Sequence, residues 1–155
     1  MKTRTIISIL ILILTVMFIG GSCATRKKVL PTDNVDELVG TWLNPEYEGK
    51  GGVEPKFTMK ADRTVLMYAS INDKEASYNG KITEIGEKWM ERDGSIYYKL
   101  IVYYESAVET VYSLVRISPD RSFFEEVYWA NPPEYPPEFD RENSKLYYRI
   151  WYRQE

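Results

Sequence analysis

Strict alternation of side chains along residues 96–105 is the feature that most constrains the fold of this chain. Every second position there is apolar or aromatic: Ile96, Tyr98, Leu100, Val102 and Tyr104. Successive side chains of a β-strand point to opposite faces, so this pattern predicts a strand that buries one face against a core. The preceding residues 92–95 (RDGS) predict a tight hairpin turn, because their glycine can adopt a positive φ.

The same period of two recurs elsewhere between turn residues. The alternating segments are residues 56–60, 65–71, 78–83, 88–91, 109–118, 122–129 and 145–153. Helical periodicity is limited to one short segment, residues 34–39, where Asp36 and Glu37 would complement the helix dipole. About eight or nine short strands joined by hairpins predict an all-β antiparallel meander, either a barrel or a sandwich. We expect the barrel, because closure removes exposed sheet edges.

The N-terminal residues predict export. Lys2 and Arg4 precede an uninterrupted apolar run over residues 6–19, and small residues then lead to Cys23, the only cysteine in the chain. This order is typical of a secretory signal. A membrane-spanning helix needs roughly 20 apolar residues, and this run is shorter. We therefore expect residues 1–22 to be a signal peptide, with an uncleaved membrane anchor as an alternative.

The sequence around Cys23 resembles the signal of bacterial lipoproteins, in which a small residue precedes a cysteine that is lipidated and becomes the mature N-terminus. Ser22-Cys23 matches this pattern. The resemblance implies lipidation of Cys23, a flexible tether over residues 23–37 and attachment to a membrane of the bacterial cell envelope. In that family, Ala24 instead of aspartate after the cysteine implies the outer membrane. Because residues 22–24 also fit ordinary signal cleavage, the alternative is a soluble secreted or periplasmic protein.

Residue counts exclude several classes of function. The chain has 20 Lys and Arg against 23 Asp and Glu, and its basic residues are scattered, so we expect no nucleic-acid partner. It has no histidine, and its one cysteine lies in the signal region, which excludes Ser-His, Cys-His and His-ligated zinc sites. Glu125 and Glu126 are adjacent in a predicted strand and would point to opposite faces. We expect no enzyme activity, no cofactor and no metal.

The predicted barrel domain, residues 38–155, begins with a recognisable motif. Gly40-Thr41-Trp42 follows the short helix and opens the first strand. This resembles the Gly-x-Trp signature of lipocalins and lipocalin-like bacterial proteins, and the resemblance implies a small lipocalin-like β-barrel. In that family, an arginine late in the barrel packs over the tryptophan, a contact that cation–π attraction favours. We assign this role to Arg149 ahead of Arg153, because Arg149 lies inside the last strand.

The aromatic residues of the barrel support two interpretations. They either pack the interior or line a cavity in which tyrosine hydroxyls orient a mostly apolar ligand. The candidates for such a cavity are Tyr98, Tyr104, Tyr112, Trp129 and Tyr148. Our leading hypothesis is a lipid-anchored envelope protein that binds a small apolar or amphipathic ligand. The alternative is an envelope protein–protein interaction module, such as a protease or lysozyme inhibitor, that uses loops at residues 46–54 or the proline-rich 131–140.

Overall fold

The computed structural model describes residues 27–45, 55–71, 74–130, 134–137, 139 and 147–155, which are mostly β-strand. In chain order the elements are β1 (Lys28–Val29), the 3₁₀ helix η1 (Asp36–Leu38), β2 (Gly40–Leu43), β3 (Lys56–Met59), β4 (Thr64–Ile71), β5 (Lys74–Met90), β6 (Ile96–Tyr104), β7 (Glu109–Ile117), β8 (Phe123–Ala130) and β9 (Tyr147–Arg153). The predicted signal segment and Cys23 lie outside the described residues.

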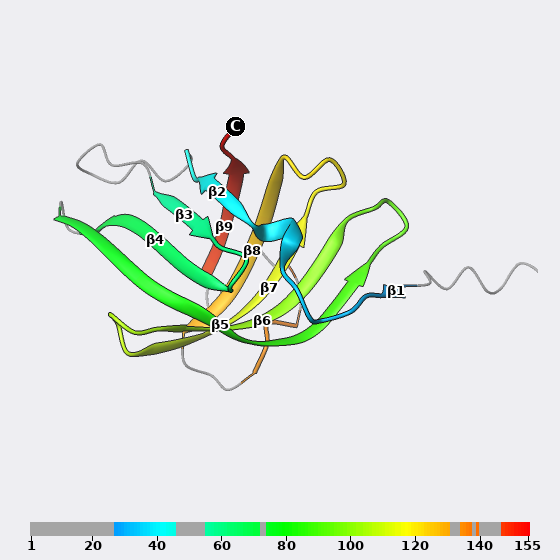
Figure 1. Cartoon of the computed structure of the whole chain (residues 1–155), viewed down its shortest axis with the longest axis horizontal. Helices are drawn as coiled ribbons and strands as arrows, with labels where there is room; N and C mark the ends of the chain where they lie inside the picture. Colours follow the sequence, from blue (N-terminus) through cyan, green and yellow to red (C-terminus); the bar gives the residue numbers. More distant parts are fainter. Residues whose placement is uncertain (1–26, 46–54, 72–73, 131–133, 138, 140–146) are drawn as a thin grey trace, which may run out of the picture.

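Eight strands, β2 to β9, close into an antiparallel barrel (Figure 1). Each strand pairs with the next in sequence, and β9 pairs back with β2, where Trp42 lies opposite Arg153. The ninth strand, β1, pairs with the end of β5, where Val29 lies opposite Trp89. The structure therefore confirms the predicted all-β class and its closure into a small lipocalin-like barrel.

The hairpin between β5 and β6 forms as the sequence predicts. Gly94 has a φ of 87°, and its N–H donates to the carbonyl of Glu91 at 3.1 Å. Side chains of β6 then alternate between buried and more exposed along the strand. Because no register shift interrupts the pairing of β6 with β7, the period of two holds from end to end.

The strand β5 is one continuous strand of 17 residues, where the sequence predicts two shorter strands. Its pairing with β6 shifts register twice, between Ile82 and Glu84 and between Ile85 and Glu87. Each β-bulge inserts one extra residue, so it changes which side chains face the interior. Consequently Ile82, Ile85 and Lys88 are all buried, although their spacing is three and not two.

Aromatic rings pack the barrel interior near the start of β2. Trp42, Phe57, Phe124 and Trp151 contact one another, with ring centroids 4.9 to 6.1 Å apart. All four side chains are buried, and full burial of such a side chain stabilises the fold by about 1.5–3 kcal/mol. We call the end of the barrel covered by η1 the base and the opposite end the mouth.

The chain before β2 closes the base. Val35 and Leu38 are each only 1% exposed and join the interior core cluster. The prediction of a flexible tether reaching residue 37 is therefore wrong for its last part, since residues 28–29 pair with β5 and Val35 is buried. Burial and backbone pairing here outweigh the conformational entropy that a free linker would keep.

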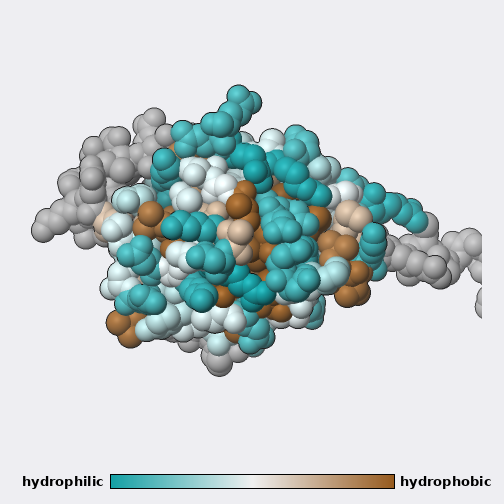
Figure 2. All heavy atoms as spheres, in the orientation of Figure 1, coloured by the Kyte–Doolittle hydropathy of each residue, from teal (hydrophilic) through white to brown (hydrophobic). Residues whose placement is uncertain are grey.

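Hydrophilic side chains cover most of the face shown in Figure 2, with hydrophobic side chains between them. The most exposed large apolar residues in the described part of the chain are Val29 on β1, Val108 in the turn between β6 and β7, and Tyr147 on β9. Scattered apolar residues are normal on protein surfaces, so they mark no site. None of the described helical residues forms a helix long and apolar enough to cross a membrane.

Candidate functional site

The structure divides the predicted cavity-lining residues between the two faces of the barrel wall. Tyr98 and Tyr104 on β6 face the interior and belong to its core cluster. Tyr112 on β7 and Trp129 on β8 lie opposite each other on the outer face, and Tyr148 packs in a separate outer cluster. The prediction is therefore wrong for these last three residues. Both faces of β7 to β9 carry apolar side chains, so the sequence pattern could not show which face is inside.

The described part of the proline-rich segment packs on this outer face. The ring of Tyr135 lies 5.7 Å from that of Tyr112, and the ring of Phe139 lies 6.0 Å from that of Tyr97. Lys99 Nζ lies 5.8 Å from the centroid of Tyr135, and burial raises the pKa of Tyr135 to about 12. The described residues of this segment therefore cover the side of the barrel.

Arg153, and not Arg149, packs over Trp42 at the base. Its guanidinium carbon lies 4.4 Å from the centroid of the Trp42 ring. It also donates hydrogen bonds to three backbone carbonyls, at 2.9 Å (Glu37), 3.4 Å (Val39) and 3.1 Å (Arg121). The assignment to Arg149 is wrong because the pairing of β2 with β9 places Arg153 directly opposite Trp42.

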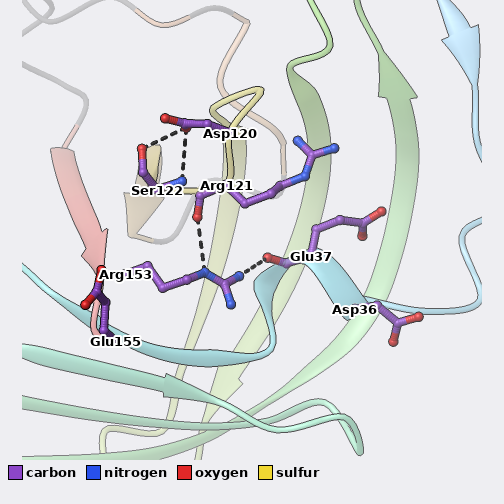
Figure 3. A pocket seen from close by; sticks show the side chains of 7 residues that line it. All are labelled: Asp36, Glu37, Asp120, Arg121, Ser122, Arg153 and Glu155. Atoms are coloured by element: carbon purple, nitrogen blue, oxygen red, sulfur yellow. Dashed lines mark hydrogen bonds between the residues drawn. The ribbon is translucent and has the colours of Figure 1, made fainter.

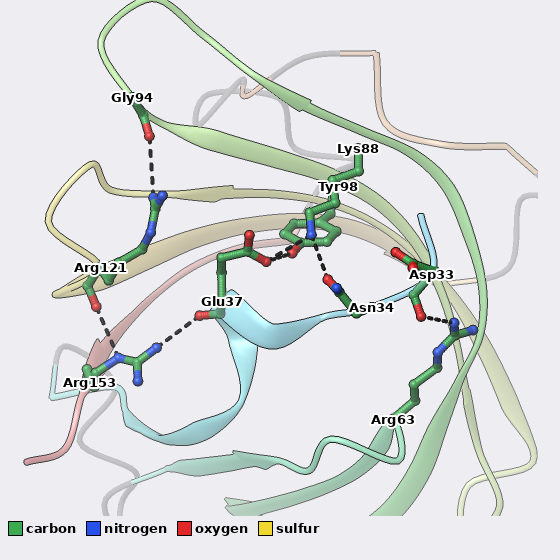
Figure 4. A network of polar contacts seen from close by, with 9 residues as sticks. All are labelled: Asp33, Asn34, Glu37, Arg63, Lys88, Gly94, Tyr98, Arg121 and Arg153. Atoms are coloured by element: carbon green, nitrogen blue, oxygen red, sulfur yellow. Dashed lines mark hydrogen bonds and ion pairs between the residues drawn. The ribbon is translucent and has the colours of Figure 1, made fainter. Parts of the chain in front are cut away.

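A buried ion pair fastens η1 to the inner wall (Figure 4). Lys88 Nζ lies 3.0 Å from Glu37 Oε2 and donates to Asn34 Oδ1 at 2.9 Å. The Tyr98 hydroxyl also donates to Glu37 Oε2. Burial disfavours the Glu37 carboxylate, but the hydrogen bonds from Tyr98 and Lys88 outweigh it and lower the pKa of Glu37. The hydroxyl of Tyr98 is therefore engaged at the base.

A surface hollow with a volume of about 500 Å³ lies at the base (Figure 3). Its lining residues are Asp36, Glu37, Asp120, Arg121, Ser122, Arg153 and Glu155. Hydrogen bonds from Ser118 and Ser122 lower the pKa of Asp120 to about 2. Arg121 donates to the carbonyls of Ser118 and Gly94, at 3.0 and 3.3 Å. Asp120, Arg121 and Arg153 thus form hydrogen bonds within the chain that close the base of the barrel. We therefore assign the hollow a structural role and not a binding role.

Toward the mouth, charged side chains face the interior. Arg149 on β9 and Glu126 on β8 are direct cross-strand partners, and both are partly exposed. Glu126 Oε1 accepts a hydrogen bond from Ser113 Oγ at 2.8 Å. Arg149 Nη1 donates to Met67 Sδ at 3.4 Å, and the guanidinium lies 4.7 Å from the centroid of Tyr128. These inward-facing side chains are therefore only partly shielded from solvent.

Two interior tyrosines flank these charges. Burial raises the pKa of Tyr128 to about 12, with Arg149 opposing and Glu126 adding to the shift. Burial also raises the pKa of Tyr104, and the Glu126 charge contributes. Both phenols are therefore neutral at physiological pH. Gly80 lies opposite Tyr104, and a Cβ there would come within 2.8 Å of the Tyr104 ring, so the missing side chain leaves room for this ring.

Two polar atoms inside the barrel have no hydrogen-bond partner within the described structure, Asn44 Oδ1 and Trp151 Nε1. Asn44 is 5% exposed and Trp151 is 1% exposed. An unsatisfied buried polar group costs about 1–3 kcal/mol, so we expect each of these atoms to bind a water molecule or a ligand. Trp151 is two residues from Arg149 on the same face of β9. We call Asn44, Ser113, Glu126, Arg149 and Trp151 the inner polar cluster.

Sequence reasoning named only one member of this cluster as a site residue, and for another role. Arg149 was assigned to Trp42, whereas it faces the mouth. The sequence does place Glu125 and Glu126 on opposite faces, and the structure shows Glu126 inside. The signal that could have found the cluster is the phase of β8, in which Glu126 stands between the buried Phe124 and Tyr128.

Comparisons with known proteins found no relative of this chain. No protein-family model matches the chain, and no curated protein and no solved structure is significantly similar to it. Among the described residues, no group of three or more His, Cys, Asp or Glu could hold a metal ion. The protein is a closed β-barrel whose interior carries polar groups on the side of the mouth.

Proposed function

We propose that this protein binds a small apolar or amphipathic molecule in the mouth half of its barrel. The inner polar cluster carries the proposal. Its Trp151 Nε1 and Asn44 Oδ1 are buried without partners, and its Arg149 faces the interior with no carboxylate within ion-pair distance among the described residues. A ligand that enters from the mouth would give these atoms partners and rest on the aromatic rings below. Ligand sites typically combine apolar walls with a few orienting polar groups.

The base provides a contrast that supports this assignment. Arg153 bonds to three carbonyls, and Lys88 bonds to Glu37 and Asn34. The charged groups of the base are thus used to hold the chain together. Those of the mouth have weaker contacts within the chain, which is the property expected of groups that bind a ligand. The proposal involves no catalysis and no cofactor.

Binding is tested with the full chain, expressed with its N-terminal segment and recovered from membranes in lipid nanodiscs. The fluorescent apolar probe N-phenylnaphthylamine should bind saturably, with empty nanodiscs subtracted. Met67→Trp places a large ring beside Arg149 and should lower the affinity at least about tenfold. Tyr112→Trp on the outer face is the matched control and should change nothing. Absence of saturable binding, or equal binding by Met67→Trp and wild type, would contradict the proposal.

We also propose that lipid on Cys23 holds the barrel at a bacterial envelope membrane, with the outer membrane as the expected location. The order of charged, apolar and small residues before Cys23 supports this. Mass spectrometry of the mature N-terminal peptide should show acyl groups on Cys23, and Cys23→Ser should leave the membrane fraction. An unmodified wild-type peptide together with membrane-bound Cys23→Ser would refute the anchor.

The alternative function, an envelope inhibitor that uses barrel loops, stays a prediction. Of the two loops concerned, residues 46–54 lie outside the described residues. In the other, Pro136 is buried and Tyr135 packs against the barrel wall. No specific observation therefore favours this function over ligand binding.

A further inference from the structure

The inner polar cluster contains two opposite charges that do not pair with each other. Arg149 and Glu126 are cross-strand neighbours, and such side chains have Cβ atoms about 4.5–5.5 Å apart. The ion pairs of the described residues do not include them. Arg149 instead contacts the thioether of Met67 and the ring of Tyr128, while Glu126 accepts from Ser113. The guanidinium and the carboxylate each keep hydrogen-bonding capacity for another molecule.

The two buried atoms that have no hydrogen-bond partner among the described residues are also one donor and one acceptor, but both are uncharged. Trp151 Nε1 is a donor and Asn44 Oδ1 is an acceptor. The pairing of β2 with β9 sets Trp42 opposite Arg153 and Leu43 opposite Tyr152, and one further step of this register leads to Asn44 and Trp151. The interior therefore holds one neutral donor and one neutral acceptor besides one cation and one anion.

A polar group that fits this arrangement both donates and accepts hydrogen bonds and carries no net charge. A carboxylate could accept from Arg149 and Trp151, but it would meet the like charge of Glu126. An ammonium could donate to Glu126 and Asn44, but it would meet Arg149. Either ion would lose its hydration on entering the interior and gain little from a pair of opposite charges. A carboxamide offers an oxygen to the donors and an N–H to the acceptors.

We propose that the barrel selects amphipathic molecules whose polar group is an uncharged carboxamide, in preference to a carboxylate or an ammonium. This inference rests on the proposed function and specifies its ligand class. An ordered water molecule could also bridge Asn44 and Trp151. In that case the polar group of a ligand would not matter to the affinity, which the experiment below detects.

The test is calorimetric titration of the full chain in lipid nanodiscs with four probes of equal chain length: decanamide, decanoate, decylamine and decan-1-ol. Decanamide should bind at least about tenfold more tightly than decanoate and decylamine. It should also bind more tightly than decan-1-ol, because a hydroxyl donates and accepts through one oxygen, whereas a carboxamide donates from a nitrogen separate from its acceptor oxygen. Glu126→Gln should raise the affinity for decanoate, and Arg149→Gln should raise the affinity for decylamine, because each removes the like charge that opposes the ion. Glu87→Gln changes an acid on the outer face and is the control that should leave all four affinities unchanged.

The outcomes separate this inference from the proposed function. Equal affinity for all four probes, or tightest binding of decanoate or decylamine by the wild type, would overturn the carboxamide preference while leaving ligand binding intact. Unchanged ion affinities in Glu126→Gln and Arg149→Gln, with circular dichroism showing both variants folded, would also overturn it. Failure of every probe to bind would remove the proposed function and this inference with it.

Discussion

Replacing Arg153 with methionine should open the base of the barrel. Methionine keeps a long apolar side chain over Trp42 but removes the guanidinium, which lies 4.4 Å from that ring and donates to three backbone carbonyls. These bonds are solvent-exposed and one is long, at 3.4 Å, so each contributes about 0.5–1 kcal/mol. The cation–π contact adds about 0.5–1 kcal/mol. We therefore expect Arg153→Met to lower the free energy of unfolding by about 2–4 kcal/mol.

This loss of stability should be visible in thermal unfolding. For a chain of 155 residues, 1 kcal/mol corresponds to a change in Tm of about 2–4 °C, so Arg153→Met should melt about 9 °C below the wild type. Circular dichroism and tryptophan fluorescence should report the same transition. The matched control is Arg149→Met, which makes the same chemical change four residues earlier on the same strand. Because the contacts of Arg149 with other described residues are those to Met67 and Tyr128, its replacement should cost less than about 1 kcal/mol.

The comparison of the two arginines decides whether the base and mouth differ as argued. An equal loss in both variants would show that Arg149 is also structural, and it would remove the main support for a binding role. An unchanged Tm in Arg153→Met would show that the contacts over Trp42 contribute nothing measurable. Either result would refute the division between a base that stabilises and a mouth that binds.

Three further predictions concern the base and the outer face. Lys88→Met should destabilise the fold by about 2–4 kcal/mol because it strands the Glu37 carboxylate, and the double variant with Glu37→Gln should recover at least half of the Tm loss. The pKa of Glu37 is lower in the folded state. The ionised carboxylate therefore stabilises the fold fully above pH about 4.5, and this stabilisation is lost as the pH falls further. Glu37→Gln should flatten the dependence of Tm on pH in that range. Gly86→Ala would place a Cβ 2.7 Å from the Tyr135 hydroxyl and should lower Tm, whereas adding Tyr135→Phe should restore it; no restoration would contradict this packing.

Most of the fold could be predicted because its signals are local. The alternation of β6 and the glycine of its hairpin act within a few residues, and the structure follows them closely. The bulges of β5 could not be predicted in this way. A bulge depends on how two strands fit around the closing barrel, and it shifts Ile85 and Lys88 out of the simple alternation. For this reason the sequence pattern does not identify Lys88 as the buried partner of Glu37.

The site was harder to predict because it depends on contacts distant in sequence. Whether Arg149 or Arg153 meets Trp42 is decided by the register between the first and last barrel strands, more than 100 residues apart. Local pattern favours Arg149, since it lies well inside the strand, and contains no information on that register. The outward direction of Tyr112 is similar, because both faces of β7 carry apolar residues, Val111 on the inner face and Leu114 on the outer face.

The two ends of the barrel also differ in what a ligand can do to stability. At the base, Arg153 and Lys88 already bond to groups of the described chain, so an added molecule has little to offer them. Farther inside, Asn44 and Trp151 each have a buried polar atom with no hydrogen-bond partner among the described residues, and each such atom lowers stability by about 1–3 kcal/mol. A molecule that binds both atoms in the folded chain alone must stabilise that state, by about 2.7 kcal/mol at 100 times its Kd. Decanamide should therefore raise the Tm of the wild type by about 5–11 °C at that concentration, and a ligand that raised Tm without contacting the inner polar cluster would place the site elsewhere.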